Sequence, residues 1–144
     1  MITANTYLTF NGNCEAAFNF YKSVFGGDFD FIGRYKEMPN DPNCEVNPED
    51  AEKIMHVSLR IGGSTIMGSD TGGEWAANYK AGNNFSISLN AESKEEADRL
   101  FKALSEEGSI TMPMNTTFWG SYFGMFTDKF GIQWMMSFDT KPKL

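Results

Sequence analysis

The same order of patterns occurs twice along the chain. A short stretch of alternating apolar and polar residues comes first, then an amphipathic stretch, then three further alternating segments. Alternation with period two is typical of β-strands, and apolar residues at i, i+3, i+4 and i+7 predict an α-helix. The sequence therefore predicts two successive strand–helix–strand–strand–strand units. Residue identity between the halves is faint, so the shared order of elements carries the prediction of a tandem repeat.

Both predicted helices have sequence signals at their ends. Their apolar stripes are Ala17, Phe20, Tyr21 and Val24 in the first, and Ala97, Leu100, Phe101 and Leu104 in the second. Asn13 is the predicted N-cap residue of the first helix, and Gly26 is predicted to end it. Ser93 and Glu96 match the capping-box pattern of the second, and Gly108 is predicted to end it.

The predicted strands complete one α+β domain, residues 1–144, built from modules of about residues 1–75 and 80–144. The strands are residues 6–10, 28–35, 54–61 and 64–69, then 84–90, 109–118, 121–127 and 132–138. Tight turns at Gly62-Gly63 and at 129–131 precede the last strand of each half. We expect two curled mixed sheets, each with a helix on one face.

Residues 112–138 hold eight aromatic residues and five of the nine Met, with Asp128 and Lys129 as their only charges. Apolar side chains fall on both faces of the predicted strands, which a sheet with one solvated face would not need. One face is expected to pack under the helix. Trp119, Phe123 and Met125 are candidates to line a cavity on the other, although a plain hydrophobic core explains the same aromatics.

Composition excludes several classes of function. A formal net charge of −7 and a pI near 4.6 argue against a nucleic-acid partner, which needs a basic face. No apolar run approaches the roughly 20 residues of a membrane helix, and the first residues do not match a signal peptide. We therefore expect a cytoplasmic protein without a membrane partner.

Two further features each allow two interpretations. Cys14, at the first predicted helix start, is either a reactive thiol or a small residue packed in a first turn, and a disulfide with Cys44 is not expected in the cytosol. Residues 37–53 are acidic, contain three Pro and have no counterpart in the second half. Such a loop is either a lid or partner contact, or a tolerated insertion.

Several residue clusters resemble a known family. They are Tyr7-Leu8-x-Phe10, Gly12 to Ala17, Phe20-Tyr21, Phe25-Gly26-Gly27, Ile54-Met55-His56, Ile61-Gly62-Gly63, Met67, Ser69-Asp70, Met112-Pro113-Met114, Phe118-Trp119-Gly120, Phe123-Gly124, and Asp128 to Ile132 with Trp134. Together they resemble the PhnB-like family of the vicinal oxygen chelate superfamily, which contains glyoxalase, bleomycin-resistance and dioxygenase proteins. The resemblance implies paired βαβββ modules, a homodimer, and a cavity in each curled sheet.

The superfamily's usual chemistry needs a divalent metal held by one residue on the first and one on the last strand of each module. The resemblance implies that these positions are Tyr7, Met67, Asn84 (or Ser86, two residues along) and Met135. None is His, Glu or Asp, and thioethers are poor ligands for hard or borderline divalent ions. We therefore predict no metal and no cofactor, with an unorthodox divalent site as the alternative.

His56 is the only histidine. It alternates with the apolar Val57, Leu59 and Ile61, so it is expected to face the cavity, as an acid or base or as a histidine satisfied by a strand neighbour. The chain has no nucleophile elbow, no G-x-G-x-x-G, no P-loop and no methyl-donor motif.

The predicted function is binding of a small apolar or aromatic molecule in a cavity without the usual metal ligands. The predicted cavity residues are Tyr7, His56, Met67, Asn84, Ser86, Trp119, Phe123 and Met135. The alternative is a lyase, isomerase or dioxygenase-like enzyme that uses His56 or an unorthodox divalent metal. A third interpretation is a partner-binding module with residues 37–53 as the contact.

Overall fold

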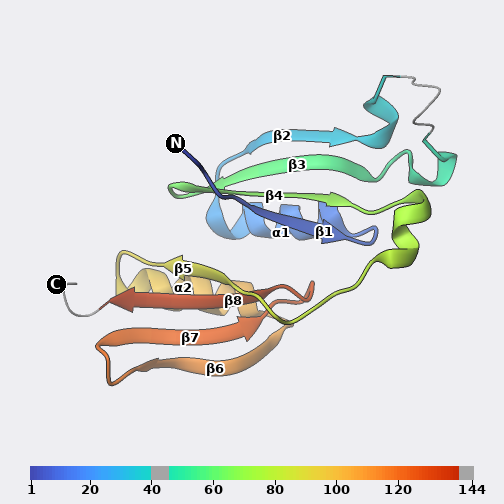
Figure 1. Cartoon of the computed structure of the whole chain (residues 1–144). Helices are drawn as coiled ribbons and strands as arrows, with labels where there is room; N and C mark the ends of the chain where they lie inside the picture. Colours follow the sequence, from blue (N-terminus) through green and yellow to red (C-terminus); the bar gives the residue numbers. More distant parts are fainter. Residues whose placement is uncertain (40–45, 140–144) are drawn as a thin grey trace. The chain divides into compact units, whose positions relative to one another are not determined.

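The computed structural model describes residues 1–39 and 46–139, without the side chains of Glu74 and Trp75. The chain divides into two compact units, Met1–Lys80 and Ala81–Leu144. Each unit contains one four-stranded sheet and one α-helix in the order strand–helix–strand–strand–strand (Figure 1). The predicted α+β class and the tandem βαβββ order are confirmed. Within the described ranges, no helix is long and apolar enough to cross a membrane.

In the first unit the strands follow the order β1-β4-β3-β2 across the sheet. The elements are β1 (Thr6–Phe10), α1 (Cys14–Phe25), β2 (Phe29–Arg34), β3 (Ile54–Ile61) and β4 (Ser64–Asp70), with short 3-10 helices at Tyr35–Glu37, Pro48–Asp50 and Gly73–Asn78. β1 pairs with β4 in parallel, and the other neighbours are antiparallel. The parallel pair requires a crossover connection, part of which α1 provides.

The second unit repeats this topology with the order β5-β8-β7-β6. Its elements are β5 (Ile87–Asn90), α2 (Lys94–Ser105), β6 (Ser109–Thr116), β7 (Ser121–Thr127) and β8 (Gln133–Asp139). The predicted strand at 109–118 is two residues too long. Thr117 instead begins the β6–β7 turn, in which its N–H donates to the Ser121 carbonyl at 2.8 Å and Gly120 N–H donates to the Thr117 carbonyl at 3.2 Å.

Each helix packs on one face of its own sheet. α1 contacts β3 and β4, and α2 contacts β6, β7 and β8 (Figure 1). The predicted stripe of α2 is buried throughout. On α1 the predicted Tyr21 is fully buried, but its buried ring neighbour is Phe18, and the predicted Phe20 is only half-buried. Both positions fit a helical period with Tyr21, and contact with the sheet selects Phe18, whose ring also packs edge-on against Phe10.

The start of α1 is stabilised by a distant carboxylate. Asn13 occupies the N-cap position, but its side chain makes no cap hydrogen bond. Asp70, at the end of β4 and 2% exposed, instead accepts the N–H groups of Gly12 and Cys14 on Oδ1, both at 2.9 Å. Its Oδ2 accepts the N–H of Ile54 at 3.0 Å. One buried carboxylate therefore joins the start of α1, the start of β3 and the end of β4.

The start of α2 is capped by residues next to it in the sequence. Ser93 Oγ accepts the N–H of Glu96 at 3.0 Å, and Glu96 Oε1 accepts the N–H of Glu92 at 3.1 Å, which confirms the predicted capping box with a partner one residue earlier. At the other end, Glu107 rather than Gly108 has the left-handed backbone, with φ of 62°. Gly108 is required for a different reason, because a side chain there would overlap the carbonyl oxygen of Thr127.

The base of the 37–53 loop is tied to its surroundings. Tyr35 N–H donates to the Lys53 carbonyl at 3.1 Å, and Lys36 N–H donates to the Ala51 carbonyl at 3.0 Å. Asp50 Oδ2 accepts the N–H of Gly73 at 3.0 Å, and the hydrogen bond from Lys53 lowers the pKa of the Asp50 carboxyl below its usual range. Residues 40–45, and Cys44 with them, lie outside the described residues, so both interpretations of the loop stay predictions.

Cys14 is fully buried, and burial, followed by the nearby charges of Asp70 and Glu15, raises the pKa of its thiol far above the ordinary value. A thiol that stays protonated is a weak nucleophile, which favours the packed-residue interpretation. In a Cys44→Ser variant, native Cys14 is expected to react with a thiol reagent at least about a hundredfold more slowly than after unfolding in urea. Equal labelling rates in the two states would support the reactive-thiol interpretation instead.

Candidate functional site

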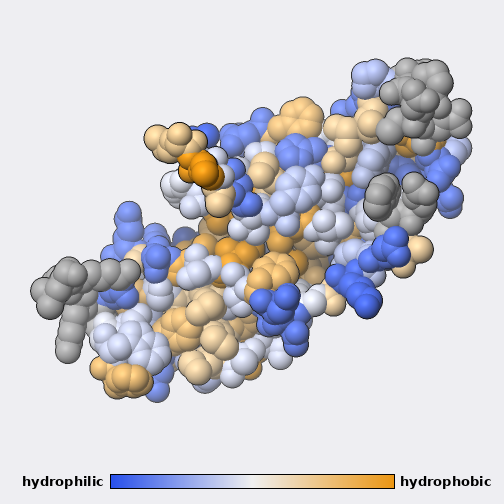
Figure 2. All heavy atoms as spheres, viewed as in Figure 1, coloured by the Kyte–Doolittle hydropathy of each residue, from blue (hydrophilic) through white to orange (hydrophobic). Residues whose placement is uncertain are grey.

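Each sheet has a second face that carries no helix of its own unit. We call the two surfaces the first and the second helix-free face. On the first, Tyr7, His56 and Met67 alternate with the buried Leu8, Val57 and Ile66. Viewed as in Figure 1, the first sheet shows apolar rings beside strongly hydrophilic side chains (Figure 2). Tyr7, His56 and Met67 lie on the face opposite to the buried Leu8, Val57 and Ile66, and their predicted place in a cavity stays a prediction.

Strand register brings four residues of the first helix-free face into one row. Tyr7 pairs with Met67, Met67 with Ser58, and Ser58 with Phe31, so the row crosses all four strands. His56 lies one pair further along β3, opposite Gly33 on β2. Side chains at neighbouring positions on one face are close enough to interact. These strand pairings therefore place aromatic and thioether groups around the histidine.

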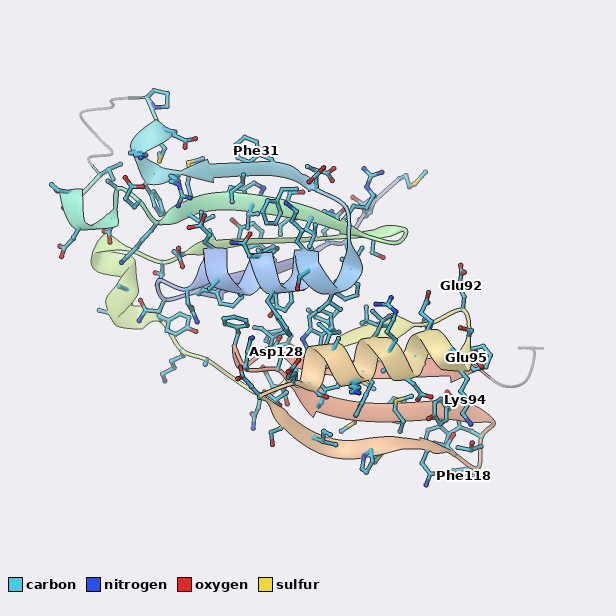
Figure 3. The ribbon with its side chains drawn as sticks, turned by 180° about the vertical axis from the view of Figure 1, so that it is seen from behind. Phe31, Glu92, Lys94, Glu95, Phe118 and Asp128 are labelled. Atoms are coloured by element: carbon cyan, nitrogen blue, oxygen red, sulfur yellow. The ribbon has the colours of Figure 1, made fainter. Side chains whose placement is uncertain are left out.

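Three rings meet on this face. The Tyr7 hydroxyl and His56 Nδ1 are 3.1 Å apart, and the two ring centroids are 5.6 Å apart with planes 27° from parallel. The Phe31 ring lies on the other side of His56, with its centroid at 5.8 Å and its plane tilted by 39°. Figure 3 shows Phe31 on the side of β2 that faces away from α1. We call Phe31, His56 and Tyr7 the aromatic row.

Gly33 leaves the space that the Phe31 ring occupies. A Cβ built on Gly33 would lie 3.0 Å from two atoms of the ring, closer than ordinary van der Waals contact. Gly33 is buried although it lies at the edge of the sheet. Neither Phe31 nor Gly33 was predicted as a site residue. The available signal was a glycine inside an apolar strand segment, which often marks close approach of another group.

Tyr35 follows β2 and makes the end of this face rigid. Its hydroxyl donates to the Asp70 carbonyl oxygen at 2.6 Å. Burial, followed by the charge of Asp70, raises the pKa of the Tyr35 phenol above its ordinary value. Tyr35 therefore stays a protonated donor and holds the end of β2 beside the end of β4.

The second helix-free face is rich in thioethers. Ser88 pairs with Met135, Met135 with Met125, and Met125 with Met112, so three methionines follow one another across β8, β7 and β6. Phe123 lies on the same face, two residues along β7 from Met125. The opposite face packs under α2 and buries Phe126, Trp134 and Met136 completely or nearly so. Long flexible Met side chains make such a surface adaptable to the shape of a ligand.

Two residues of the second module were predicted to lie in a strand but precede it. The prediction began the strand at Asn84, but β5 begins at Ile87, so Asn84 and Ser86 precede it. The residue that lies opposite Met135, as Tyr7 lies opposite Met67, is Ser88. Polar residues alternate identically at 84, 86 and 88. The period-two alternation therefore predicts which face these polar residues share, but not which of them pairs with Met135.

Trp119 lies in the turn between β6 and β7, outside the two strands, as the predicted strand bounds implied. It is 60% exposed, its neighbour Phe118 is 96% exposed, and their rings meet edge-on at 4.9 Å. Trp119 also contacts Phe123, with ring centroids 6.2 Å apart. Phe118 projects from the tip of this hairpin (Figure 3). Only Phe123 of this aromatic group belongs to a strand of the second helix-free face.

The donor groups at the four corresponding strand positions do not fit a divalent metal ion. They are a phenol at Tyr7, already bonded to His56, a hydroxyl at Ser88, and thioethers at Met67 and Met135. Carboxylate and imidazole are the donors that such ions prefer. In the two described stretches, no cluster of three or more His, Cys, Asp or Glu side chains could hold a metal.

The buried carboxylates of the two units have structural partners. Asp70 is used by backbone N–H groups at the start of α1 and β3. Asp128 accepts the N–H groups of Phe130 and Ile132 on Oδ1 and the Trp134 indole N–H on Oδ2 at 2.8 Å. These carboxylates shape turns next to the sheets. The helix-free faces themselves carry rings, thioethers, hydroxyls and the His56 imidazole. Arg60 lies on the same face of β3 as His56, with its Nε 3.8 Å from Asp30 Oδ2.

Comparisons with known proteins place this arrangement in a family. Residues 3–137 match the model of the family described as 3-demethylubiquinone-9 3-methyltransferase. Protein YjdN from Escherichia coli K12 is 36% identical over 139 residues, which cover 91% of each chain.

Solved structures agree over almost the whole length. Protein PA1353 from Pseudomonas aeruginosa is 39% identical with a TM-score of 0.83, covering 98% of this chain and 100% of that one. The PhnB protein from Bacillus cereus is 27% identical with a TM-score of 0.75, covering 95% and 99%. A glyoxylase/bleomycin resistance protein/dioxygenase domain from Frankia sp. EAN1pec shares the fold at 15% identity, with a TM-score of 0.65 and coverage of 99% and 95%. The chain therefore belongs to the PhnB-like family described as 3-demethylubiquinone-9 3-methyltransferase, and it shares its fold with a protein of the glyoxalase/bleomycin resistance/dioxygenase type.

Proposed function

We propose that this chain binds a small apolar or aromatic molecule on the helix-free faces of its sheets, without a divalent metal. The observation that carries the proposal is the composition of the two equivalent strand pairs. Tyr7 with Met67 and Ser88 with Met135 occupy the positions implied for metal ligands, and three of the four side chains are apolar or aromatic. Exposed Phe31 and Met112 extend the same surfaces.

Apolar groups left exposed on a sheet are typical of a binding surface. Tyr7 is 47% exposed, Phe31 49% and Met112 43%, although each belongs to a regular strand. Ligand sites combine such apolar walls with a few polar groups that orient the ligand. Here the polar groups are His56 and Ser58 on the first face and Ser88 on the second. The homodimer implied by the resemblance stays a prediction, to be checked by sedimentation.

The family description names a methyl transfer, which we do not extend to this chain. Its sequence has no Gly-rich methyl-donor motif, and the helix-free faces offer rings and thioethers for apolar contact. Equilibrium dialysis with S-adenosylmethionine checks this point. Stoichiometric retention of S-adenosylmethionine would favour the family's printed activity over the proposed binding function.

The binding proposal is tested with the neutral fluorescent probe N-phenyl-1-naphthylamine. Met67→Glu places a carboxylate in the first helix-free face, and bringing a ligand against that charge costs desolvation energy. We expect the dissociation constant of the probe to rise at least about tenfold. Ser64→Glu adds the same charge at an exposed position that starts β4 and is expected to leave binding unchanged.

Metal dependence is measured on the same protein. After dialysis against Zn²⁺, Mn²⁺ or Ni²⁺, the wild-type chain is expected to retain no stoichiometric metal and to bind the probe with unchanged affinity. Tightly held metal that is lost in the Met67→Leu variant or in the Met135→Leu variant would contradict the proposal. It would favour the alternative of an unorthodox divalent site.

A second candidate is an enzyme in which His56 acts as general base. The observation that favours it is the Tyr7–His56 hydrogen bond, and this candidate requires that Nδ1–H donates to the Tyr7 oxygen and leaves Nε2 as the acceptor. A base is effective when a neighbour holds its ring in one orientation. For any turnover that is found, a pH–rate profile of the wild type and of His56→Ala decides the matter. Loss of the profile's ascending limb in the variant would support this candidate, and identical profiles would remove His56 from the mechanism.

A further inference from the structure

The only histidine of the chain has one ring nitrogen engaged and one facing no described partner. His56 Nδ1 lies 3.1 Å from the Tyr7 hydroxyl, and no residue of the described stretches is bonded to Nε2. A neutral imidazole has one acceptor nitrogen and one N–H donor. A phenol is a better donor than acceptor, so this pair is best satisfied when Tyr7 donates to Nδ1. The proton of the ring is then on Nε2.

The rings beside His56 keep part of their faces uncovered. Their centroids are 5.6 Å and 5.8 Å from that of His56, and the planes are within 39° of parallel. Aromatic planes in contact are about 3.5 Å apart, so the rings are offset sideways by roughly 4 Å. Side-by-side rings of this kind form a broad surface. About half of Tyr7 and of Phe31 is exposed on it.

Resting on the binding function proposed above, we propose that the first helix-free face recognises a planar aromatic molecule that carries a carbonyl, carboxylate or phenolic oxygen. The ligand ring stacks on the aromatic row, and its oxygen accepts a hydrogen bond from His56 Nε2–H. Tyr7 acts as a positioning residue because its hydroxyl determines which nitrogen of His56 carries the proton. Gly33 is a second positioning residue because its missing side chain leaves room for Phe31.

With its proton on Nε2, His56 cannot act as a general base. A ring that carries its proton on Nε2 and accepts on Nδ1 has no free lone pair to offer a substrate. The same ring is a good donor to an oxygen. An aromatic ligand that lacks the oxygen would leave this N–H unpaired under the ligand, and unpaired polar groups weaken binding. We expect a preference of about tenfold for the oxygen-bearing ligand.

Because His56 is the only histidine, its ring can be followed by NMR without assignment. Long-range ¹H–¹⁵N spectra of the full chain, recorded at a pH where the ring is neutral, distinguish the Nε2–H from the Nδ1–H tautomer. The probes are 2-naphthoate, naphthalene and cyclohexanecarboxylate. We expect the Nε2–H tautomer in the free protein. We also expect 2-naphthoate to shift the Nε2 signal and to bind about tenfold more tightly than either other probe.

Two variants separate the parts of the proposal. Tyr7→Phe keeps a ring but removes the hydroxyl, so the Nδ1–H tautomer is expected to appear and binding of 2-naphthoate to weaken more than binding of naphthalene. Gly33→Ala is expected to displace Phe31 and to weaken both naphthalene and 2-naphthoate. Gly63→Ala is the control, because a Cβ there meets nothing within 4 Å.

Each of the following results would contradict one part of the proposal. An unchanged tautomer in Tyr7→Phe, or an Nδ1–H tautomer in the wild type, would refute the role given to Tyr7. Equal affinity for the three probes, with shifts in the backbone signals of the first unit, would refute the ligand class and leave the binding function standing. If no probe, including N-phenyl-1-naphthylamine, shifted any signal, the binding function itself would fail.

Discussion

Replacing Asp70 by alanine is expected to lower the free energy of unfolding by about 4 kcal/mol. The carboxylate is 2% exposed and accepts three backbone N–H groups, from Gly12, Cys14 and Ile54. Alanine would leave the buried N–H groups of Cys14 and Ile54 and the part-buried N–H of Gly12 without this partner. Each hydrogen bond to a charged group is worth roughly 1.5–3 kcal/mol. Urea denaturation followed by circular dichroism measures the loss. Faster amide exchange at Gly12, Cys14 and Ile54 localises it.

Two further variants test the reason for this loss. Asp70→Asn keeps one acceptor oxygen but points an NH₂ group at a backbone donor, so an intermediate loss is expected. Asp28→Ala removes a carboxylate whose side chain is 94% exposed and is expected to change stability by no more than about 0.5 kcal/mol. A similar loss in Asp70→Ala and Asp28→Ala would show that charge, rather than the three backbone hydrogen bonds of Asp70, is responsible.

Replacing Gly108 by alanine is expected to cost about 3 kcal/mol or more. The added Cβ would overlap the carbonyl oxygen of Thr127 and lie 3.0 Å from backbone atoms of Asp128. Backbone atoms cannot rotate away as the end of a side chain can. The substitution must therefore separate the loop after α2 from the end of β7. Thermal or urea unfolding of the variant measures the cost.

Gly82→Ala is the matched control in the same unit. A Cβ on Gly82 would come no closer than 3.8 Å to another group, the Asn84 Oδ1 atom, and its backbone is outside the left-handed region. We expect a change within about 0.5 kcal/mol. If Gly82→Ala and Gly108→Ala were equally destabilised, backbone flexibility rather than the close contact with Thr127 would explain the need for glycine.

Local pattern was sufficient to predict most of the secondary structure. The strands at 6–10, 54–61 and 121–127 have the predicted bounds, and most of the others differ by one or two residues at an end. The Ser93–Glu96 capping box is also present as predicted. These features depend on neighbours within a few residues, so period and capping chemistry reveal them.

Predictions failed where several positions shared the same local pattern. Polar residues at 84, 86 and 88 fit one face equally, and pairing with β8 selects Ser88. Phe18 and Phe20 both fit a helical stripe, and contact with the sheet buries Phe18. Gly108 was expected to end α2 through its backbone freedom, but the left-handed residue is Glu107 and Gly108 instead allows close approach of β7.

The sequence by itself determined the βαβββ order, the faces of Tyr7, His56 and Met67, and the absence of His, Glu and Asp from the implied metal positions. These depend on periodicity and on residue identity. Only the tertiary structure joined Tyr7 to His56, which are 49 residues apart, placed Phe31 over Gly33, and gave Asp70 its three backbone donors. Such contacts form between strands whose register is set by packing of the whole sheet, so no local pattern contains them.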